Sequence, residues 1–302
     1  MADAATPAFP PDSHTQPSHQ PAIHWFDQIA PLRQALVTLE PFRQAGESAF
    51  ERLDALRGWC AGCGAWREFR MPRPIAGGWR DLRESFICTC GLNGRMRAAL
   101  LLLERAAASL GTSPRMLALE RLTPLYTVAR ARLPSLEGAE YLGPTYKPGQ
   151  QVSTGGVLVR HESLERLSPG DGSLDLVFHA DVLEHVADFK RALTECARVL
   201  RPGGSLLFTC PMFDLESHIT RATVGAAGLV HHRPPIYHGN PLSEGGSLVF
   251  HQFGWPLFND VLRAGFSAVR VALVYDPLQG IVSNNNPYAE GRMWQLFIAA
   301  SR

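Results

Sequence analysis

The feature that most constrains this chain is the segment at residues 171–211, where strand, turn, helix and strand patterns follow one another without interruption. Residues 173–179 (SLDLVFH) form an apolar run typical of a buried strand, and residues 205–210 (SLLFTC) form a second one. Between them, Asp188 is placed to cap a helix that stops before Pro202-Gly203-Gly204. Two strands joined by a helix predict a parallel pair in an α/β sheet.

Alternating apolar runs and amphipathic segments continue on both sides of this unit. Thr123 is predicted to cap a helix that has Pro124 at its first position. Pro31 and Pro41 predict that the apolar pattern between residues 25 and 59 forms only short helices. Further strands are expected at residues 115–120, 139–142, 157–161, 269–274 and 294–300. We therefore expect a doubly wound, mostly parallel seven-stranded sheet.

Composition and patterning suggest three regions. Residues 1–24 are rich in Pro, Ser, His and Gln and are predicted to be a disordered tail, residues 25–94 a helical and cysteine-bearing module, and residues 95–302 the main domain. The 29 Lys and Arg nearly balance the 28 Asp and Glu, which gives no general attraction to nucleic acid or anionic lipid. Without a secretory signal or a membrane-spanning stretch, a cytoplasmic protein with no membrane partner is expected.

Four of the six cysteines occur as two close pairs, each followed by glycine. They are Cys60-Ala-Gly-Cys63-Gly and Cys88-Thr-Cys90-Gly. Paired thiolates followed by glycine are typical of zinc knuckles, in which backbone amides wrap around a tetrahedral metal. The second pair has one intervening residue rather than two, and buried thiols are the alternative interpretation. We expect a structural zinc ion on these four cysteines.

The segment at residues 171–211 resembles the central part of class I S-adenosylmethionine-dependent methyltransferases of the type 11 kind. Their pattern is an aspartate-led strand, a D-x-x-E-H turn, a helix, R-V-L-[RK]-P-G-G and another strand. This chain has Asp181-Val-Leu-Glu-His185 and Arg198-Val-Leu-Arg-Pro-Gly-Gly204 at those places. The resemblance implies S-adenosylmethionine as cofactor, bound beyond the carboxyl ends of the strands, and methyl transfer to oxygen or nitrogen of a small-molecule or glycan acceptor.

The same resemblance assigns cofactor-binding residues by position. Family members carry an acidic residue and a glycine-rich loop after the first strand, whereas residues 120–126 contain no glycine, so the helix start at Thr123 would offer its N–H groups instead. Glu140 resembles the acid that holds the ribose hydroxyls, and Glu162 the residue that meets the adenine amino group. An exposed loop carboxylate is the alternative for either. The candidates are Glu120, Thr123, Glu140, Glu162, His179 and Asp181.

The turn after residues 173–179 and the segment at residues 211–254 supply candidates for catalysis and acceptor binding. His185 is the candidate base, because L-E-H resembles the turn of small-molecule O-methyltransferases and imidazole titrates near neutral pH. The alternative is a histidine that packs against or caps the next helix. Substrate contacts are expected from His218, Tyr237 and His238, although loop histidines are also commonly solvated.

Two other functions fit parts of the sequence. An RNA methyltransferase could use the cysteine module as a reader, since its arginines are interleaved with aromatic residues, although packing around a small metal core explains the same residues. These aromatic residues are Trp59, Trp66, Phe69, Trp79 and Phe86. A non-catalytic binding protein with this fold is the second alternative, because the glycine-rich cofactor loop is missing.

Overall fold

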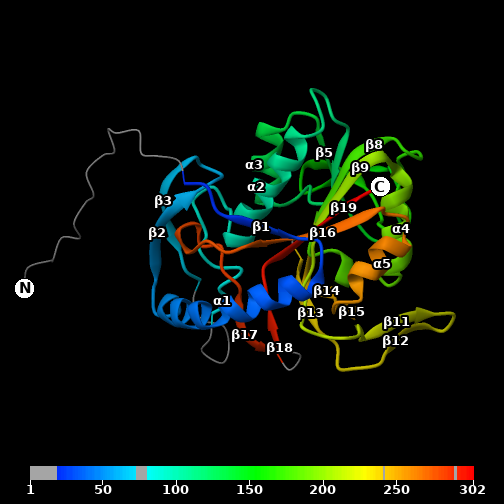
Figure 1. Ribbon diagram of the computed structural model, residues 1–302. Helices are drawn as coiled ribbons and strands as arrows, with labels where there is room; N and C mark the ends of the chain where they lie inside the picture. The colour runs from blue at the N-terminus through cyan, green and yellow to red at the C-terminus, as the bar shows by residue number, and fades with distance from the viewer. Residues whose placement is uncertain (1–18, 73–79, 241, 289–290) are drawn as a thin grey trace, which may run out of the picture.

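The computed structural model describes residues 19–72, 80–240, 242–288 and 291–302. Most of the predicted tail, residues 1–18, therefore lies outside the described residues. A nine-stranded sheet forms the centre of the molecule (Figure 1). Its strands, in spatial order, are β1 (Ile23–Phe26), β16 (Ala268–Val274), β19 (Leu296–Ser301), β9 (Leu200–Thr209), β8 (Leu174–Ala180), β4 (Met116–Ala118), β5 (Leu136–Glu140), β7 (Val157–His161) and β6 (Gln151–Thr154).

The sheet is doubly wound, as expected. Strands β7, β5, β4, β8 and β9 are parallel, and the strand order reverses at β4, which has β5 on one side and β8 on the other. β19 is antiparallel to both of its neighbours. All seven expected strands are present, and β1 and β6 extend the sheet at its two edges. β6 reaches β7 through Gly155-Gly156, which both have positive φ, as a tight hairpin turn requires.

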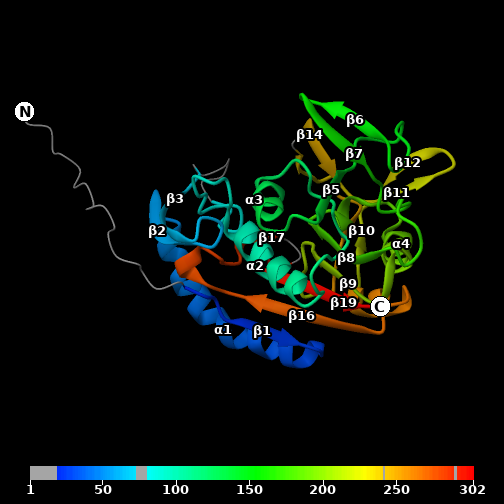
Figure 2. The same ribbon diagram turned by 90° about the horizontal axis from the view of Figure 1, so that it is seen from above.

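Helices cover both faces of this sheet because its strands alternate buried side chains between two cores. In β8, Val177 belongs to one core and its neighbours Leu176 and Phe178 to the other. The first core packs under α1 (Ile29–Phe50), α4 (Phe189–Val199) and α5 (Leu257–Arg263). The second packs under α2 (Gly94–Ala108) and α3 (Pro124–Arg132), which lie side by side in Figures 1 and 2.

The prediction of short helices before residue 59 is wrong, because α1 is a single helix of 22 residues. Pro31 lies in its first turn, where no intrahelical N–H bond is lost. Pro41 lies inside the helix and removes one bond, to the carbonyl of Val37, whose side chain is on the solvent side and 67% exposed. Water can satisfy that carbonyl, while Leu32 and Leu36 hold the other side of the helix in the core.

The cysteine-bearing part is a hairpin, β2 (Ala55–Cys60) and β3 (Ala65–Arg70), followed by a loop that leads to α2. It has a small core of its own, which includes Phe69, Leu82 and Phe86 and is completed by Val282 from the main domain. β1 and α1, in contrast, pack on the main sheet. The division at residues 24 and 94 stays a prediction.

The segment expected to bind the acceptor is built from short hairpins. Two short 3-10 helices complete the chain, η1 (Leu183–His185) before α4 and η2 (Pro277–Gln279) after β16. No helix of the described chain is long and apolar enough to cross a membrane. The remaining strands pair as β10 (Ile219–Thr220) with β15 (His251–Gln252), β11 (Ala222–Gly225) with β12 (Gly228–His231), β13 (Tyr237–Asn240) with β14 (Ser243–Leu248), and β17 (Asn284–Tyr288) with β18 (Gly291–Met293).

Candidate functional site

The first strand and its helix bring two predicted residues together at the carboxyl edge of the sheet. Thr123 caps α3 as expected: its hydroxyl accepts from the N–H of Tyr126 at 3.2 Å, and Pro124 follows in the first turn. The same hydroxyl donates to the carboxylate of Glu120 at 2.8 Å. Burial raises the pKa of Glu120 to about 7, against the opposing effect of Arg95 and Thr123.

Glu140, at the end of the neighbouring β5, lies beside this turn. Its carboxylate accepts from the N–H of Leu122 at 3.3 Å. Burial raises its pKa to about 7, although that backbone bond lowers it. At pH 7, Glu120 and Glu140 are therefore each about half protonated. Both lie at the turn that has no glycine, and a negative charge on one disfavours a negative charge on the other.

Glu162 does not join them. Its carboxylate accepts from Arg160 Nε at 2.7 Å and from the N–H and the hydroxyl of Ser168, so both of its oxygens are used within the loop that follows β7. The preceding residue, His161, packs beside the rings of Tyr141 and Tyr146, with centroids 5.4 and 5.8 Å away. The contacts of Glu162 thus stabilise the loop that follows β7.

His179 and Asp181 lie at the end of β8 in contrasting surroundings. His179 is fully buried against Phe208, neither ring nitrogen has a protein partner among the described residues, and burial lowers its pKa to about 3. Asp181 has a left-handed backbone, with φ of 52°. Burial alone would raise the pKa of Asp181, but Arg83 and Arg95 hold it at about 2.

The arginines that hold Asp181 were not among the predicted site residues. Arg83 Nη2 donates to both carboxylate oxygens of Asp181, at 2.7 and 2.6 Å, and Arg95 Nε lies 3.3 Å from one of them. Glu84 joins the same group through Arg95 Nε at 2.8 Å. Arg83 and Glu84 come from the cysteine module, and Arg95 from the first turn of α2. In the sequence, the segment that holds Arg83 stood out only as rich in basic and aromatic residues. Composition of this kind cannot show that an arginine will pair with Asp181.

Among the residues predicted to act on the acceptor, the structure brings His185 and His238 together. Their rings meet edge to face, with centroids 5.0 Å apart, and Glu184 lies beside both. The Nδ1 of His185 lies 2.8 Å from the carbonyl oxygen of Leu248. Tyr237, next to His238, is 55% exposed.

His218 has a different environment from the other predicted substrate contacts. Its Nε2 lies 2.9 Å from a carboxylate oxygen of Asp260 in α5, and its Nδ1 accepts from the N–H of Gly254 at 3.2 Å. The rings of Phe189 and Phe253 pack against it. With both nitrogens engaged, His218 connects α5 to the acceptor segment.

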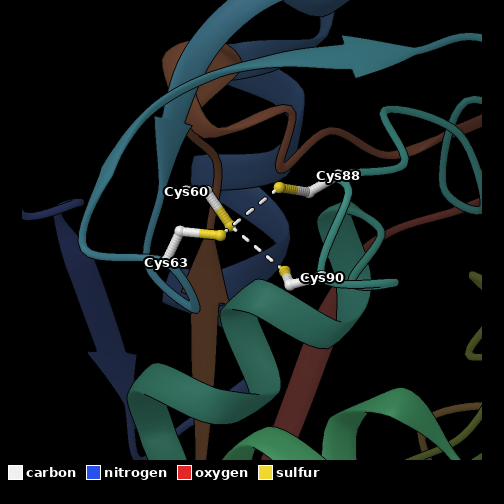
Figure 3. A group of neighbouring side chains, drawn as sticks. All are labelled: Cys60, Cys63, Cys88 and Cys90. Atoms are coloured by element: carbon white, nitrogen blue, oxygen red, sulfur yellow. Dashed lines mark hydrogen bonds between the residues drawn. The ribbon is translucent and has the colours of Figure 1, made fainter.

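The two cysteine pairs converge on one point. Figure 3 shows the four sulfur atoms turned toward each other, with Cys60 and Cys63 at the end of the β2–β3 hairpin and Cys88 and Cys90 on the loop before α2. Sγ atoms of Cys60 and Cys90 are 3.6 Å apart, those of Cys63 and Cys88 are 3.7 Å apart, and all four lie within 4.8 Å of one another. Zinc–sulfur bonds of about 2.3 Å give a tetrahedron with edges of about 3.8 Å, so this donor set fits zinc.

A buried arginine side chain lies near the cysteines. Arg97 of α2 is fully buried, lies over the ring of Phe69 with 4.0 Å to its centroid, and donates to the carbonyl oxygens of Gln279, Leu92 and Phe86. Burial lowers its pKa to about 10, whereas the nearby Cys60, Cys88 and Cys90 raise it. A positive charge here offsets the excess negative charge of four thiolates on a divalent ion.

Comparison with known proteins identifies the central part of this fold. Residues 135–208 match the family described as a methyltransferase domain. A probable S-adenosylmethionine-dependent methyltransferase of Mycolicibacterium smegmatis is 43% identical over 53 residues, which are 18% of this chain and 21% of that protein. A ubiquinone biosynthesis O-methyltransferase of Caulobacter vibrioides is 35% identical over 72 residues, which are 24% of this chain and 28% of that protein.

The matched part is thus short: the chain spans 21% and 28% of the lengths of these two curated relatives. Among solved structures, an S-adenosylmethionine-dependent methyltransferase of Mesorhizobium loti is 17% identical, with a TM-score of 0.40, and the match covers 69% of this chain and 98% of that one.

Proposed function

Since this chain carries a class I methyltransferase domain, we propose that it binds S-adenosylmethionine at the carboxyl edge of β4, β5 and β8 and transfers the methyl group to a small-molecule or glycan acceptor. The observation that carries the proposal is the group of opposite charges gathered where the strand order reverses, which is the place at which doubly wound sheets bind their ligands. The sulfonium supplies an already activated methyl group, so the protein has to align the reactants and exclude water.

The charges at this edge match the groups of the cofactor. Glu140, which accepts only backbone N–H bonds, has the position and the capacity to accept the two ribose hydroxyls. Glu120 is suited to the amino group, and Arg83 and Arg95, which Asp181 holds in place, are suited to the carboxylate. Nε of Arg83 has no partner among the described residues and is buried, which leaves a donor for a ligand.

These arginines also explain how the site could dispense with glycine. In a glycine-rich loop, backbone N–H groups approach the cofactor closely. Here the N–H of Leu122 is turned to Glu140 instead. We propose that the guanidinium groups of Arg83 and Arg95, contributed from outside the sheet, provide the donors that the loop does not.

His185 is the proposed base for acceptors that must lose a proton. A carbonyl oxygen only accepts hydrogen bonds, so the contact with Leu248 places the proton of His185 on Nδ1 and leaves Nε2 as an acceptor. Tyr237 and His238 are the proposed acceptor contacts. We propose that the atom methylated is an oxygen or a nitrogen of the acceptor. The RNA alternative is the weaker one, because Trp59, Phe69 and Phe86 are buried and present no stacking surface. Trp66 is half-buried, and Trp79 lies outside the described residues.

We propose further that Cys60, Cys63, Cys88 and Cys90 hold one structural zinc ion. The four thiols meet in a segment whose own core is small, and a metal would supply the folding free energy that this core lacks. Because Arg83 lies in the same segment, the ion would also position a cofactor contact.

The cofactor assignment can be tested by calorimetric titration of zinc-loaded protein with S-adenosylmethionine and S-adenosylhomocysteine. One ligand per chain is expected. Glu140→Gln should weaken binding about tenfold or more, because hydrogen bonds to a charged acceptor contribute about 1.5–3 kcal/mol. His185→Gln should leave cofactor affinity unchanged, since its role concerns the acceptor.

Glu137→Gln is the matched control. Glu137 is on the same strand as Glu140, but its side chain is 68% exposed and pairs with Arg160 at 2.9 Å. This variant should bind like the wild type. If the wild type shows neither heat nor thermal shift at millimolar ligand, the enzyme proposal is wrong for this chain, and a non-catalytic binding protein becomes the better hypothesis.

A further inference from the structure

Glu184, His185 and His238 form a second cluster of metal-ligand type, separate from the cysteines. Oε1 of Glu184 lies 3.7 Å from Nε2 of His185 and 3.6 Å from Nδ1 of His238. One ligand atom from each of the three residues lies within 4.8 Å of the other two. Bonds of about 2.0–2.2 Å from a metal to such ligands give separations of about 3.3–3.6 Å in a tetrahedral arrangement, close to the two separations measured from Glu184.

Glu184 is the residue that points to a ligand. Its side chain is 1% exposed, and neither carboxylate oxygen has a hydrogen-bond partner within the described parts of the chain. A buried carboxylate without partners costs several kcal/mol, so native proteins pair such groups or use them to coordinate metals. His185 and His238 lie at ion-pair distance from Oε1, 3.7 and 3.6 Å, and would neutralise it only when protonated, and neither makes a hydrogen bond to it.

The orientation of His185 fits a metal ligand. Its Nδ1–H donates to the carbonyl oxygen of Leu248, so Nε2 presents a lone pair toward the carboxylate of Glu184. Two lone pairs facing each other repel unless a proton or a metal cation lies between them. A backbone carbonyl that fixes the tautomer of a histidine is also the usual support for a metal-binding imidazole.

We propose that Glu184, His185 and His238 bind one divalent transition-metal cation. Two imidazole nitrogens and one carboxylate oxygen suit iron, cobalt, zinc or manganese rather than calcium or magnesium, which prefer oxygen ligands. Asp181 lies nearby but is occupied by Arg83, so it is not counted as a ligand. Three protein ligands leave at least one coordination position open, as in catalytic rather than structural metal sites.

The open position gives the ion a role in the proposed function, and this part of the inference rests on that function. The metal would bind the hydroxyl oxygen of an acceptor and lower the pKa of that hydroxyl, so that its proton passes to water and the oxygen can take the methyl group; the site would therefore favour acceptors that carry a hydroxyl group. With an ion on Nε2, His185 would act as a ligand and would no longer be the base. The site would then select its acceptor by oxygen coordination.

The test is a cobalt titration of protein whose cysteines already hold zinc, without any S-adenosylmethionine. Equilibrium dialysis should give one Co²⁺ per chain in addition to zinc. Its visible spectrum should show only weak d–d bands, because a strong thiolate-to-cobalt band in the near ultraviolet would mark exchange at the cysteines. Glu184→Gln and His238→Ala should each weaken cobalt binding at least tenfold.

His232→Ala is the matched control, because His232 lies in the same segment, is exposed, and hydrogen-bonds to Thr223. It should bind cobalt like the wild type. His238 is partly exposed, with 36% of its side chain accessible, so its variant tests the site even if Glu184→Gln were unstable. Absence of cobalt beyond the cysteines, or equal binding by the wild type and the folded variants, would overturn the metal site. Either result leaves the cofactor titration unaffected, so the two proposals fail separately.

Discussion

At the scale of single residues, the buried carboxyl group of Glu120 makes stability depend on pH. Its pKa rises from an ordinary value of 4.5 to about 7 on folding, so folding favours the protonated form. The stability it contributes is complete below about pH 4.5 and is lost as the pH rises through 7. Between pH 5.5 and 8, the wild type should therefore lose about 2 kcal/mol relative to Glu120→Gln, which stays neutral.

Urea unfolding of both proteins at each pH measures this difference. The comparison with Glu120→Gln is needed because His179 acts in the opposite direction: burial lowers its pKa to about 3, so its contribution falls as the pH drops below 6.5. His179 and Glu140, whose pKa is about 7, are present in both proteins, so what each contributes on its own cancels. The difference then reports Glu120 together with its repulsion of Glu140. A stability difference that does not change with pH would show that Glu120 is charged throughout this range.

At the scale of elements, the start of α3 depends on one hydroxyl. Thr123 caps the helix through Tyr126 N–H and also donates to Glu120, so it ties the helix to the end of β4. Thr123→Ala should cost about 1–2 kcal/mol of unfolding free energy, because a cap is lost and a buried carboxyl group loses a donor. Denaturant titration measures the change.

Thr127 offers a control in the same helix. It is exposed, and its hydroxyl donates to the carbonyl oxygen of Thr123 at 3.4 Å, a bond that leaves no buried group unsatisfied when removed. Thr127→Ala should change stability by less than about 0.5 kcal/mol. If both variants lost the same unfolding free energy, the cap at Thr123 would contribute no more to stability than an exposed hydroxyl.

At the scale of the whole molecule, the cysteine module and the sheet meet at the proposed cofactor site. Arg83 comes from the module and binds Asp181 at the end of β8, across 98 residues of sequence. Removal of zinc by a chelator should loosen the module and weaken S-adenosylhomocysteine binding at least tenfold, while the main sheet stays folded. Circular dichroism and calorimetry of stripped and zinc-restored protein measure the two effects.

Restored zinc should recover the affinity, which separates loss of the ion from irreversible damage. Undiminished affinity in the stripped protein would show that the module does not contribute to the cofactor site. Arg83→Gln provides the complementary test, because it removes the contact while leaving the four cysteines intact, and it should weaken binding without releasing zinc.

Local patterns were enough to predict the doubly wound sheet. The apolar run at residues 173–179 corresponds to β8 (Leu174–Ala180), and the helix capped by Asp188 ends at Val199, before Pro202. The cap at Thr123 was likewise predicted correctly. These features depend on neighbours within a few positions in the chain: alternation in a strand, an oxygen at a helix start, or a proline that cannot continue a helix.

What the sequence by itself determined is therefore the seven central strands, the helices that Thr123 and Asp188 cap, and the two cysteine pairs that meet in one cluster. Only the tertiary structure decided that α1 passes through Pro41, that Glu162 is used by its own loop, that Arg83 reaches Asp181, and that Glu184 is buried beside two histidines. The physical reason is that burial and charge pairing depend on residues distant in sequence, and no local pattern records which side chain will lie opposite.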